Sequence, residues 1–304
     1  MIDLDVIDAG LDRALNVATR AKPVRAPVPE PTPPPGRTTR TTRRARTTAP
    51  RRRERRVDPA AAAGEDNPLR LLEAGRLADA DARMAVATDR REIVTWATMR
   101  ALLVGNEVAA RAGVDELLAL ARAGGDQETW DRYWAQRFWA AFEWGGAEER
   151  RDVLDHCRER AYRFDDLEWW GRLTLLLAST GKADEATRAS DDAQLLLERA
   201  ARDGRWLDAA TDLVDGAAVL GDARRAAALA RTVRWPAGRL VVVGDGVVCK
   251  GSIDRYTALG HVAAGNWAAA AECFRRADEA HRDLGAGPLL ARTRLQASAA
   301  RVAA

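Results

Sequence analysis

Few side chains in this chain of 304 residues have the types and spacing that catalysis needs. One pair, His156-Cys157, has the composition of a metal ligand pair or of a nucleophile with its base. Adjacent residues of a helix point about 100° apart, so these two side chains do not converge easily on one ion. Neither the metalloprotease pattern H-E-x-x-H nor the hydrolase pattern G-x-S-x-G occurs. We therefore expect structural or surface roles for the histidines, no catalytic residues and no bound cofactor or metal.

Two other polar patterns are weaker signs of chemistry. The turn Gly244-Asp245-Gly246 resembles a phosphate cradle, but the next helix starts at Ser252 or later, too far to place its N-terminus on a phosphate at the turn. We interpret the turn as a structural hairpin, with a loop that edges a ligand groove as the alternative. Carboxylate pairs such as Asp165-Asp166 are sequence neighbours, whereas acid–base catalysis needs carboxylates that converge across a cleft. We expect helix caps and solvated faces there.

Tryptophan is unusually frequent, with ten residues against three tyrosines and four phenylalanines. The tryptophans gather in residues 130–144 and at Trp169-Trp170. One helical stripe cannot bury them all, because positions 130, 134 and 138 share a face that 139 and 142 leave. We expect most to pack between helices and the exposed remainder to bind a protein or peptide, since aromatic side chains anchor protein interfaces. The residues selected for this surface are Trp130, Trp134, Trp139 and Trp169.

A basic arm is the second candidate surface. Residues 1–56 carry 14 Lys/Arg and 6 Asp/Glu, a net charge of +8, which leaves 34 basic and 39 acidic residues, or −5, in 57–304. Clustered arginines bind nucleic-acid phosphates by releasing counterions, but here no interleaved aromatic side chains could stack on bases. Three roles stay open: a bare linker, a sequence-independent nucleic-acid contact and a contact with an acidic partner. The arm ends in Arg51, Arg52, Arg53, Arg55 and Arg56.

Helices joined by tight turns must position all these residues. The frame G-x-Φ-x2-A-x3-Φ-x2-small is clearest at Gly265, Trp267, Ala270, Phe274 and Ala277. Its glycines recur at steps of 30 to 44 residues, the length of a helix–turn–helix unit. Glycine suits the left-handed turn between paired helices, and alanine allows two helices to approach closely. We therefore predict an all-α fold, an α-solenoid of helix pairs with a concave face. The other anchors are Gly75, Gly105, Gly145, Gly181 and Gly221.

The helical repeats occupy one of three predicted regions. Residues 1–20 predict an isolated amphipathic helix, with Leu4, Ile7, Leu11 and Leu15 near helical spacing. Residues 21–64 are rich in Pro, Arg and Thr and predict a disordered linker. Residues 67–304 form the repeat domain, and valine runs on both sides of a Gly-Asp-Gly turn predict a short β-hairpin insertion near 240–249.

The spacing of Trp, Leu, Gly, Ala and Phe over about residues 68–285 resembles tetratricopeptide repeats. In addition, the sequence C-x-G-S-I-D-R-Y from Cys249 and the sequence LGAGPLLARTR at 284–294 resemble the C-terminal repeat region of bacterial signal-transduction ATPases with LuxR-type or AfsR-type DNA-binding domains. In that family the repeats follow an ATPase module and are taken to sense a ligand or partner. This chain has no G-x-x-x-x-G-K-[S/T] phosphate loop and no recognisable helix-turn-helix, so the resemblance implies neither ATPase activity nor sequence-specific DNA binding.

Several broad classes of protein are excluded by the sequence. Apolar runs such as residues 240–244 are too short to span a bilayer, and the acidic N-terminus lacks the order of a secretory signal. Three widely spaced cysteines predict a reducing compartment, the cytoplasm. The sequence therefore predicts a non-catalytic interaction or sensory module in bacterial regulation, which binds a protein or peptide on its concave face. The alternative is a nucleic-acid-associated protein that uses its arginine arm, and homo-oligomers stay open in both cases.

Overall fold

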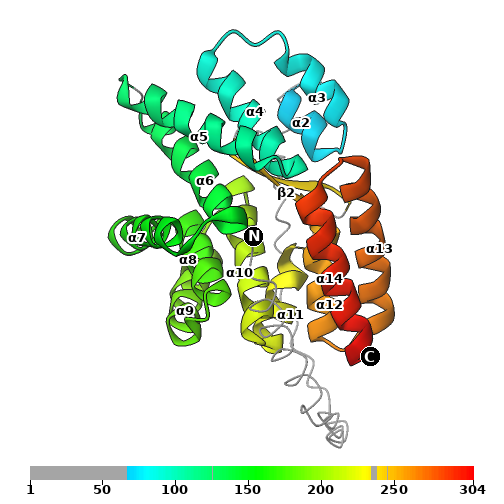
Figure 1. Cartoon of the computed structure of the whole chain (residues 1–304). Helices are drawn as coiled ribbons and strands as arrows, with labels where there is room; N and C mark the ends of the chain where they lie inside the picture. Colours follow the sequence, from blue (N-terminus) through cyan, green and yellow to red (C-terminus); the bar gives the residue numbers. More distant parts are fainter. Residues whose placement is uncertain (1–66, 125, 234–237, 245) are drawn as a thin grey trace, which may run out of the picture.

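The computed structural model of the chain (Figure 1) describes residues 67–124, 126–233, 238–244 and 246–304. The predicted helix at 1–20, the predicted linker at 21–64 and the arginines at 51–56 lie outside these ranges. Within them the chain is helical apart from one β-hairpin, which confirms the predicted all-α fold with a short hairpin. The elements are α2 (Pro68–Glu73), α3 (Leu77–Met84), α4 (Arg90–Val104), α5 (Glu107–Arg122), α6 (Gln127–Trp144), α7 (Ala147–Phe164), α8 (Leu167–Ser179), α9 (Ala183–Arg199), α10 (Gly204–Leu220), α11 (Ala223–Val233), β1 (Leu240–Val243), β2 (Val248–Ser252), α12 (Ile253–Ala263), α13 (Trp267–Asp283) and α14 (Gly287–Ala303).

The turns between paired helices follow the repeat frame, with one exception. Gly105 and Gly221 end α4 and α10 in the left-handed conformation, with φ of 81° and 73°. Gly145 after α6 is extended instead, with φ of −68°, so the prediction of a left-handed turn there is wrong. A side chain at this position would meet the backbone of Ala141 at 2.5 Å, which explains why glycine is needed. The small residues of the frame are buried between helices: Ala80, Ala110, Ala186, Ala226 and Ala270.

The repeats form an inner and an outer layer of helices. The inner helices α8 and α10 are buried without interruption over residues 169–178 and 208–217. They pack closely because Gly171 faces the backbone of Ala209, where an added Cβ would lie 2.9 Å from its Cα atom. Outer helices such as α9 bury one stripe only, at spacings of three and four residues, and expose the rest. Any binding site on an outer helix must therefore lie on its exposed face.

The β-hairpin fills the inside of the array. β1 and β2 are antiparallel, pairing Leu240 with Ser252 and Val243 with Val248, and every residue of both strands is buried. β1 contacts α2 and α10, whereas β2 contacts α4, α6, α12 and α13, so helices surround the hairpin (Figure 1). Gln136 of α6 donates hydrogen bonds of 2.8 Å to the carbonyl oxygens of Thr95 and Val247. The hairpin therefore joins helices that lie far apart in the sequence.

Two features of the described residues concern membrane spanning and the position of the cysteines. The described helices include none with an apolar stretch that would reach across a bilayer. Cys157, Cys249 and Cys273 are all buried and form no disulfide with one another. Their thiols belong to the helical core and the hairpin rather than to the surface.

Candidate functional site

Two of the four tryptophans selected from the sequence are core residues. Trp139 and Trp169 expose only 6% and 2% of their surface. Their helices are covered on several faces, since α6 contacts α4, α5, α7 and β2, and α8 contacts α7, α9 and α10. The expectation that Trp139 and Trp169 are exposed is therefore wrong. Helical spacing alone does not show how many neighbouring helices cover an inner helix of this array.

Trp130 and Trp134 are half-buried near the start of α6. Trp134 stacks on His156 with ring centroids 3.8 Å apart, and the Arg137 guanidinium lies 5.5 Å from its ring. Trp130 contacts Tyr133 edge to face at 5.9 Å. Both rings have structural partners and retain some exposed surface, so a role of these two residues in partner binding stays a prediction.

The pair His156-Cys157 does not form a reactive site. His156 lies between the rings of Trp134 and Trp169, and burial, aided by the charges of Arg160 and Arg172, lowers its pKa to about 4. Burial raises the pKa of the Cys157 thiol, so that thiol stays protonated at neutral pH. Among the described residues no group of three or more His, Cys, Asp or Glu side chains could hold a metal ion.

A buried ionic cluster joins the hairpin to α10 and α8. Lys250 of β2 donates hydrogen bonds to the Asp208 carboxylate at 2.9 Å and to the Thr211 hydroxyl at 2.7 Å. Its ammonium also lies 2.5 Å from the Asp212 carboxylate. On the other side, Arg172 of α8 donates to Asp208 at 2.7 Å. All these groups are buried. No sequence pattern singles them out, because 36 to 42 residues separate the partners.

The cluster has charged groups but no room for a substrate. Burial raises the pKa of Asp212 to about 7, and Lys250 opposes that effect. For Lys250 itself, burial disfavours the ammonium, yet Asp208 and Asp212 outweigh burial and raise its pKa. The adjoining cavity, lined by Trp139, Cys249 and Tyr256 among others, is about 30 Å³, enough for roughly one or two waters. We therefore interpret the cluster as a structural feature that holds the hairpin against α10, which it also joins to α8.

A buried histidine fixes the far end of the hairpin. The Nε2 atom of His281 accepts a hydrogen bond of 2.8 Å from the backbone N–H of Ser252. Its Nδ1 atom lies 3.0 Å from the hydroxyl of Thr293, which donates its own proton to the Leu289 carbonyl oxygen. The neutral ring therefore carries its proton on Nδ1. Burial, together with the charges of Arg255 and Arg292, lowers the pKa of His281 to about 3.

Acid is expected to destabilise the protein through His281. Its pKa in the folded state lies below the value of about 6.5 in the unfolded chain, so its contribution is complete above that pH and is lost as the pH falls towards 3. One such group changes the free energy of unfolding by up to about 1.4 kcal/mol per pH unit, or about 2 kcal/mol between pH 6.5 and 5. Urea unfolding near pH 7 and near pH 5 measures the loss. In His281→Asn the loss should be smaller by about that amount, and an equal loss in both proteins would contradict the assignment.

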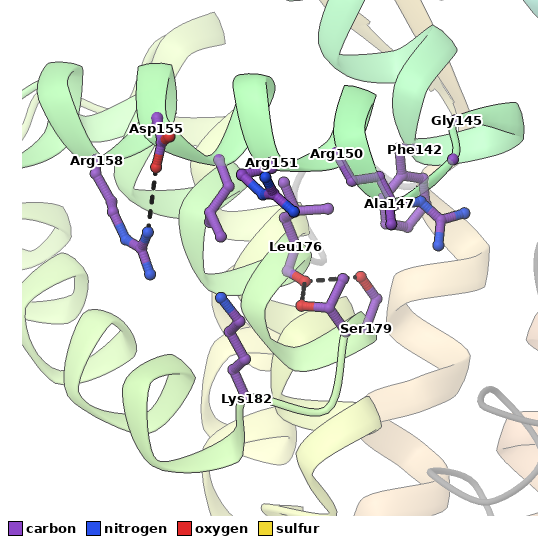
Figure 2. Close-up of a pocket in the computed structure, with 13 residues that line it drawn as sticks. Phe142, Gly145, Ala147, Arg150, Arg151, Asp155, Arg158, Leu176, Ser179 and Lys182 are labelled. Atoms are coloured by element: carbon purple, nitrogen blue, oxygen red, sulfur yellow. Dashed lines mark hydrogen bonds and ion pairs between the residues drawn. The ribbon is translucent and has the colours of Figure 1, made fainter.

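An open groove of about 680 Å³ lies between α7 and the turn from α8 to α9 (Figure 2). Its volume is within the usual range of ligand sites. Its apolar residues are Phe142 at the end of α6, Leu154 of α7 and Leu176 of α8. Four cationic side chains and a single carboxylate, that of Asp155, also line it, which gives a net charge of +3. The cationic residues are Arg150, Arg151, Arg158 and Lys182. We call this site the basic groove.

The cations of the basic groove differ in how they are neutralised. Arg158 pairs with Glu185 of α9 at 2.7 Å and with Asp155 at 3.3 Å. Arg151 and Lys182 are exposed and form no ion pair with any described residue. In Figure 2, Lys182 extends from the start of α9 toward the side of α7 that carries Arg151. Two cations, one on α7 and one at the N-cap of α9, therefore line one groove without an acidic partner among the described residues.

The beginning of α7 adds to the positive character of the basic groove. Its N-cap is Gly146, which supplies no side-chain cap for the first backbone N–H groups, and Gly146 and Ala147 both line the groove. A free helix N-terminus favours anions. The acidic residues of this first turn, Glu148 and Glu149, lie on another side, in a depression shared with Arg111. The two acidic side chains of the first turn are therefore not among the described residues that line the basic groove.

The basic groove was not among the sites selected from the sequence. Arg151, Asp155 and Arg158 recur at i, i+4 and i+7, which places them on one face of α7. That spacing was a usable signal, but arginine is common throughout the chain and such faces are usually solvated. Lys182 comes from the next repeat, so only the packing of α7 against α8 reveals that it belongs to the same site.

The basic groove is built by two neighbouring repeats, because its residues come from α6, α7, α8 and the start of α9. The likenesses of residues 68–285 to tetratricopeptide repeats and of residues 180–300 to regulator repeat regions remain resemblances of pattern. No protein-family model matches this chain, and neither a curated protein nor a solved structure matches it significantly.

Proposed function

We propose that this protein is a non-catalytic helical-repeat interaction module that binds an acidic peptide segment of a protein partner in the basic groove. The observation that carries the proposal is the presence, beside apolar side chains in an open groove, of two cations, Arg151 and Lys182, that form no ion pair with a described residue. The proposal places the binding surface in the groove beside α7, whereas the sequence led us to expect it on the concave face of the array. Its setting in cytoplasmic bacterial regulation rests on the resemblance of the repeats and on the use of cysteine.

The composition of the basic groove suits a peptide better than a small anion. Apolar side chains such as Leu154 and Leu176 can bury an anchor residue, while rim charges select and orient its acidic neighbours. The lining residues of α7 run from Ala147 to Arg158, about 16 Å at 1.5 Å per residue. An extended peptide rises about 3.3 Å per residue, so the groove matches roughly five residues.

Charge reversal in the basic groove is expected to weaken this binding. The probe is a peptide Glu-Glu-Leu-Glu-Glu with a neutral fluorescent dye, titrated with the full chain at about 0.1 M salt, where the Debye length is about 10 Å. The double variant Arg151→Glu with Lys182→Glu should raise the Kd at least about tenfold, equal to about 1.4 kcal/mol, because attraction becomes repulsion. Fluorescence anisotropy measures the change. A Gln-Gln-Leu-Gln-Gln peptide should bind more weakly to the wild type than the acidic probe does.

A matched control separates the groove from net charge. Arg122 of α5 and Arg224 of α11 are exposed, lie outside the groove and form no ion pair with a described residue. Arg122→Glu with Arg224→Glu changes the net charge equally and should leave the Kd within about twofold, since distant exposed charges are screened by salt. Equal losses in the two double variants would contradict the proposal. If instead labelled duplex DNA is retained, and the retention is lost at high salt and on deletion of residues 37–56, the nucleic-acid alternative is favoured.

A further inference from the structure

A second groove, of about 580 Å³, runs between α13 and α14, and its described lining residues belong to these two helices and to Ala304. Its apolar surface includes the rings of Trp267 and Phe274 and the small residues Ala270, Ala297 and Ala300. A repeat array buries such a face by stacking another helix on it. Among the described elements, α13 packs mainly on α12, α14 and β2, so this side of the helix pair is uncovered.

Charges at the rim of the α13–α14 groove are predominantly positive. The lining residues include four arginines against Asp278 and Glu279, which gives a net charge of +2. Arg301 is exposed and has no ion pair with a described residue. An occupant with an apolar stripe and an acidic flank would complement both features. The four arginines are Arg275, Arg282, Arg294 and Arg301.

We propose that residues 3–20 of this chain, which lie outside the described residues, dock as a helix in the α13–α14 groove. Their apolar stripe, formed by Leu4, Ile7, Leu11 and Leu15, would cover the Trp267 side of the groove. Four aspartates against two arginines give the segment a net charge of −2, opposite to that of the groove. As a helix, 18 residues are about 27 Å long, close to the roughly 26 Å of the 17 residues of α13.

The tether between the segment and the groove has a suitable length and starting point. The first described residue, Asn67, caps α2, whose Leu71 and Leu72 belong to the same apolar cluster as Leu284 and Leu289 at the α13–α14 turn. The chain therefore emerges near one end of the groove. The 46 residues of 21–66 reach at most about 150 Å at about 3.3 Å per residue, which is enough to span the length of α13. Because the segment belongs to the same chain, a weaker contact is sufficient than between separate molecules.

Accessibility of a thiol in the groove tests this docking in the full chain. Ala297→Cys places a reporter in the groove, and the three native cysteines are buried and should react slowly. Adding Ile7→Asp and Leu11→Asp should speed the reaction of the reporter with a thiol reagent at least tenfold. The conservative pair Ile7→Leu and Leu11→Ile should preserve the protection. A reporter at Leu195→Cys on α9, which is exposed and whose helix packs on α8 and α10, should react equally in every background.

The effect of dilution on the protection of the Ala297→Cys thiol shows whether the same chain or a second copy fills the groove. Protection that does not change on dilution supports docking within one chain. Protection that is lost on dilution shows that the segment of a second copy fills the groove, which overturns the proposal as stated. Equal reaction rates of the Ala297→Cys reporter with and without the aspartate substitutions would overturn it entirely. The basic groove is not involved in this test, so its result is independent of peptide binding there.

Discussion

Replacing Lys250 with methionine is expected to lower the free energy of unfolding by about 3–5 kcal/mol. Methionine keeps much of the shape of the side chain but removes the ammonium that contacts Asp208 and Asp212 at 2.9 and 2.5 Å. Two buried carboxylates then share a single cation, Arg172. An unpaired buried charge is costly because it has lost its hydration without gaining a partner. Chemical unfolding followed by far-ultraviolet circular dichroism measures the loss.

A surface lysine provides the control for this substitution. Lys182 is exposed and unpaired, so Lys182→Met should change the free energy of unfolding by no more than about 0.5 kcal/mol. The loss in Lys250→Met should also shrink as the pH falls. Burial raises the pKa of Asp212 and the Lys250 ammonium opposes that effect, so without the ammonium the pKa lies further above its value in the unfolded chain and protonation at low pH restores part of the lost stability. A small loss that is independent of pH would show that the buried ionic cluster does not hold the hairpin in place.

Gly251→Ala is expected to destabilise the fold by about 3 kcal/mol. Gly251 has φ of 82°, a conformation that costs a residue with a side chain about 1–2 kcal/mol. The added Cβ would also lie 2.3 Å from Nε2 of His281 and 2.8 Å from a methyl group of Leu289. Relief of this collision requires His281 to move away from the backbone N–H of Ser252, which costs about a further 1–2 kcal/mol.

Gly181→Ala separates the two contributions. Gly181 has nearly the same backbone conformation, with φ of 76°, but an added Cβ would meet no atom within 4 Å. Its replacement should therefore cost only the backbone term, about 1–2 kcal/mol. The difference between the two variants in thermal or urea unfolding reports the contact of the hairpin with His281. Equal losses would mean that the strand shifts freely and that this contact contributes little.

The helical array was predictable from local sequence signals. The frame around Gly265 and Ala270 identified the turn and the close helix contact, and Ala270 is indeed buried. The β-branched runs correctly located the hairpin. These features depend on residues within one or two helical turns of each other, which is the range over which spacing carries information.

The interior of the array was not predictable in the same way. Lys250 and its partner Asp208 look like ordinary solvated charges in the sequence, and only the insertion of the hairpin between the helices buries them together. The same insertion covers Trp139, which sequence spacing had left exposed. The basic groove requires Arg151 and Lys182 from successive repeats, and their proximity depends on the packing of α7 on α8.

Photocrosslinking with an acidic peptide tests the central claim most directly, because it locates the binding surface on the full chain. The probe is a Glu-Glu-Leu-Glu-Glu peptide in which benzoylphenylalanine replaces the leucine. We predict that mass spectrometry finds the adducts on α7 and on residues 176–182, that an excess of unlabelled acidic peptide competes, and that Arg151→Glu with Lys182→Glu abolishes them. Adducts on the arginine-rich residues 37–56, or spread evenly over the molecule, would contradict the account.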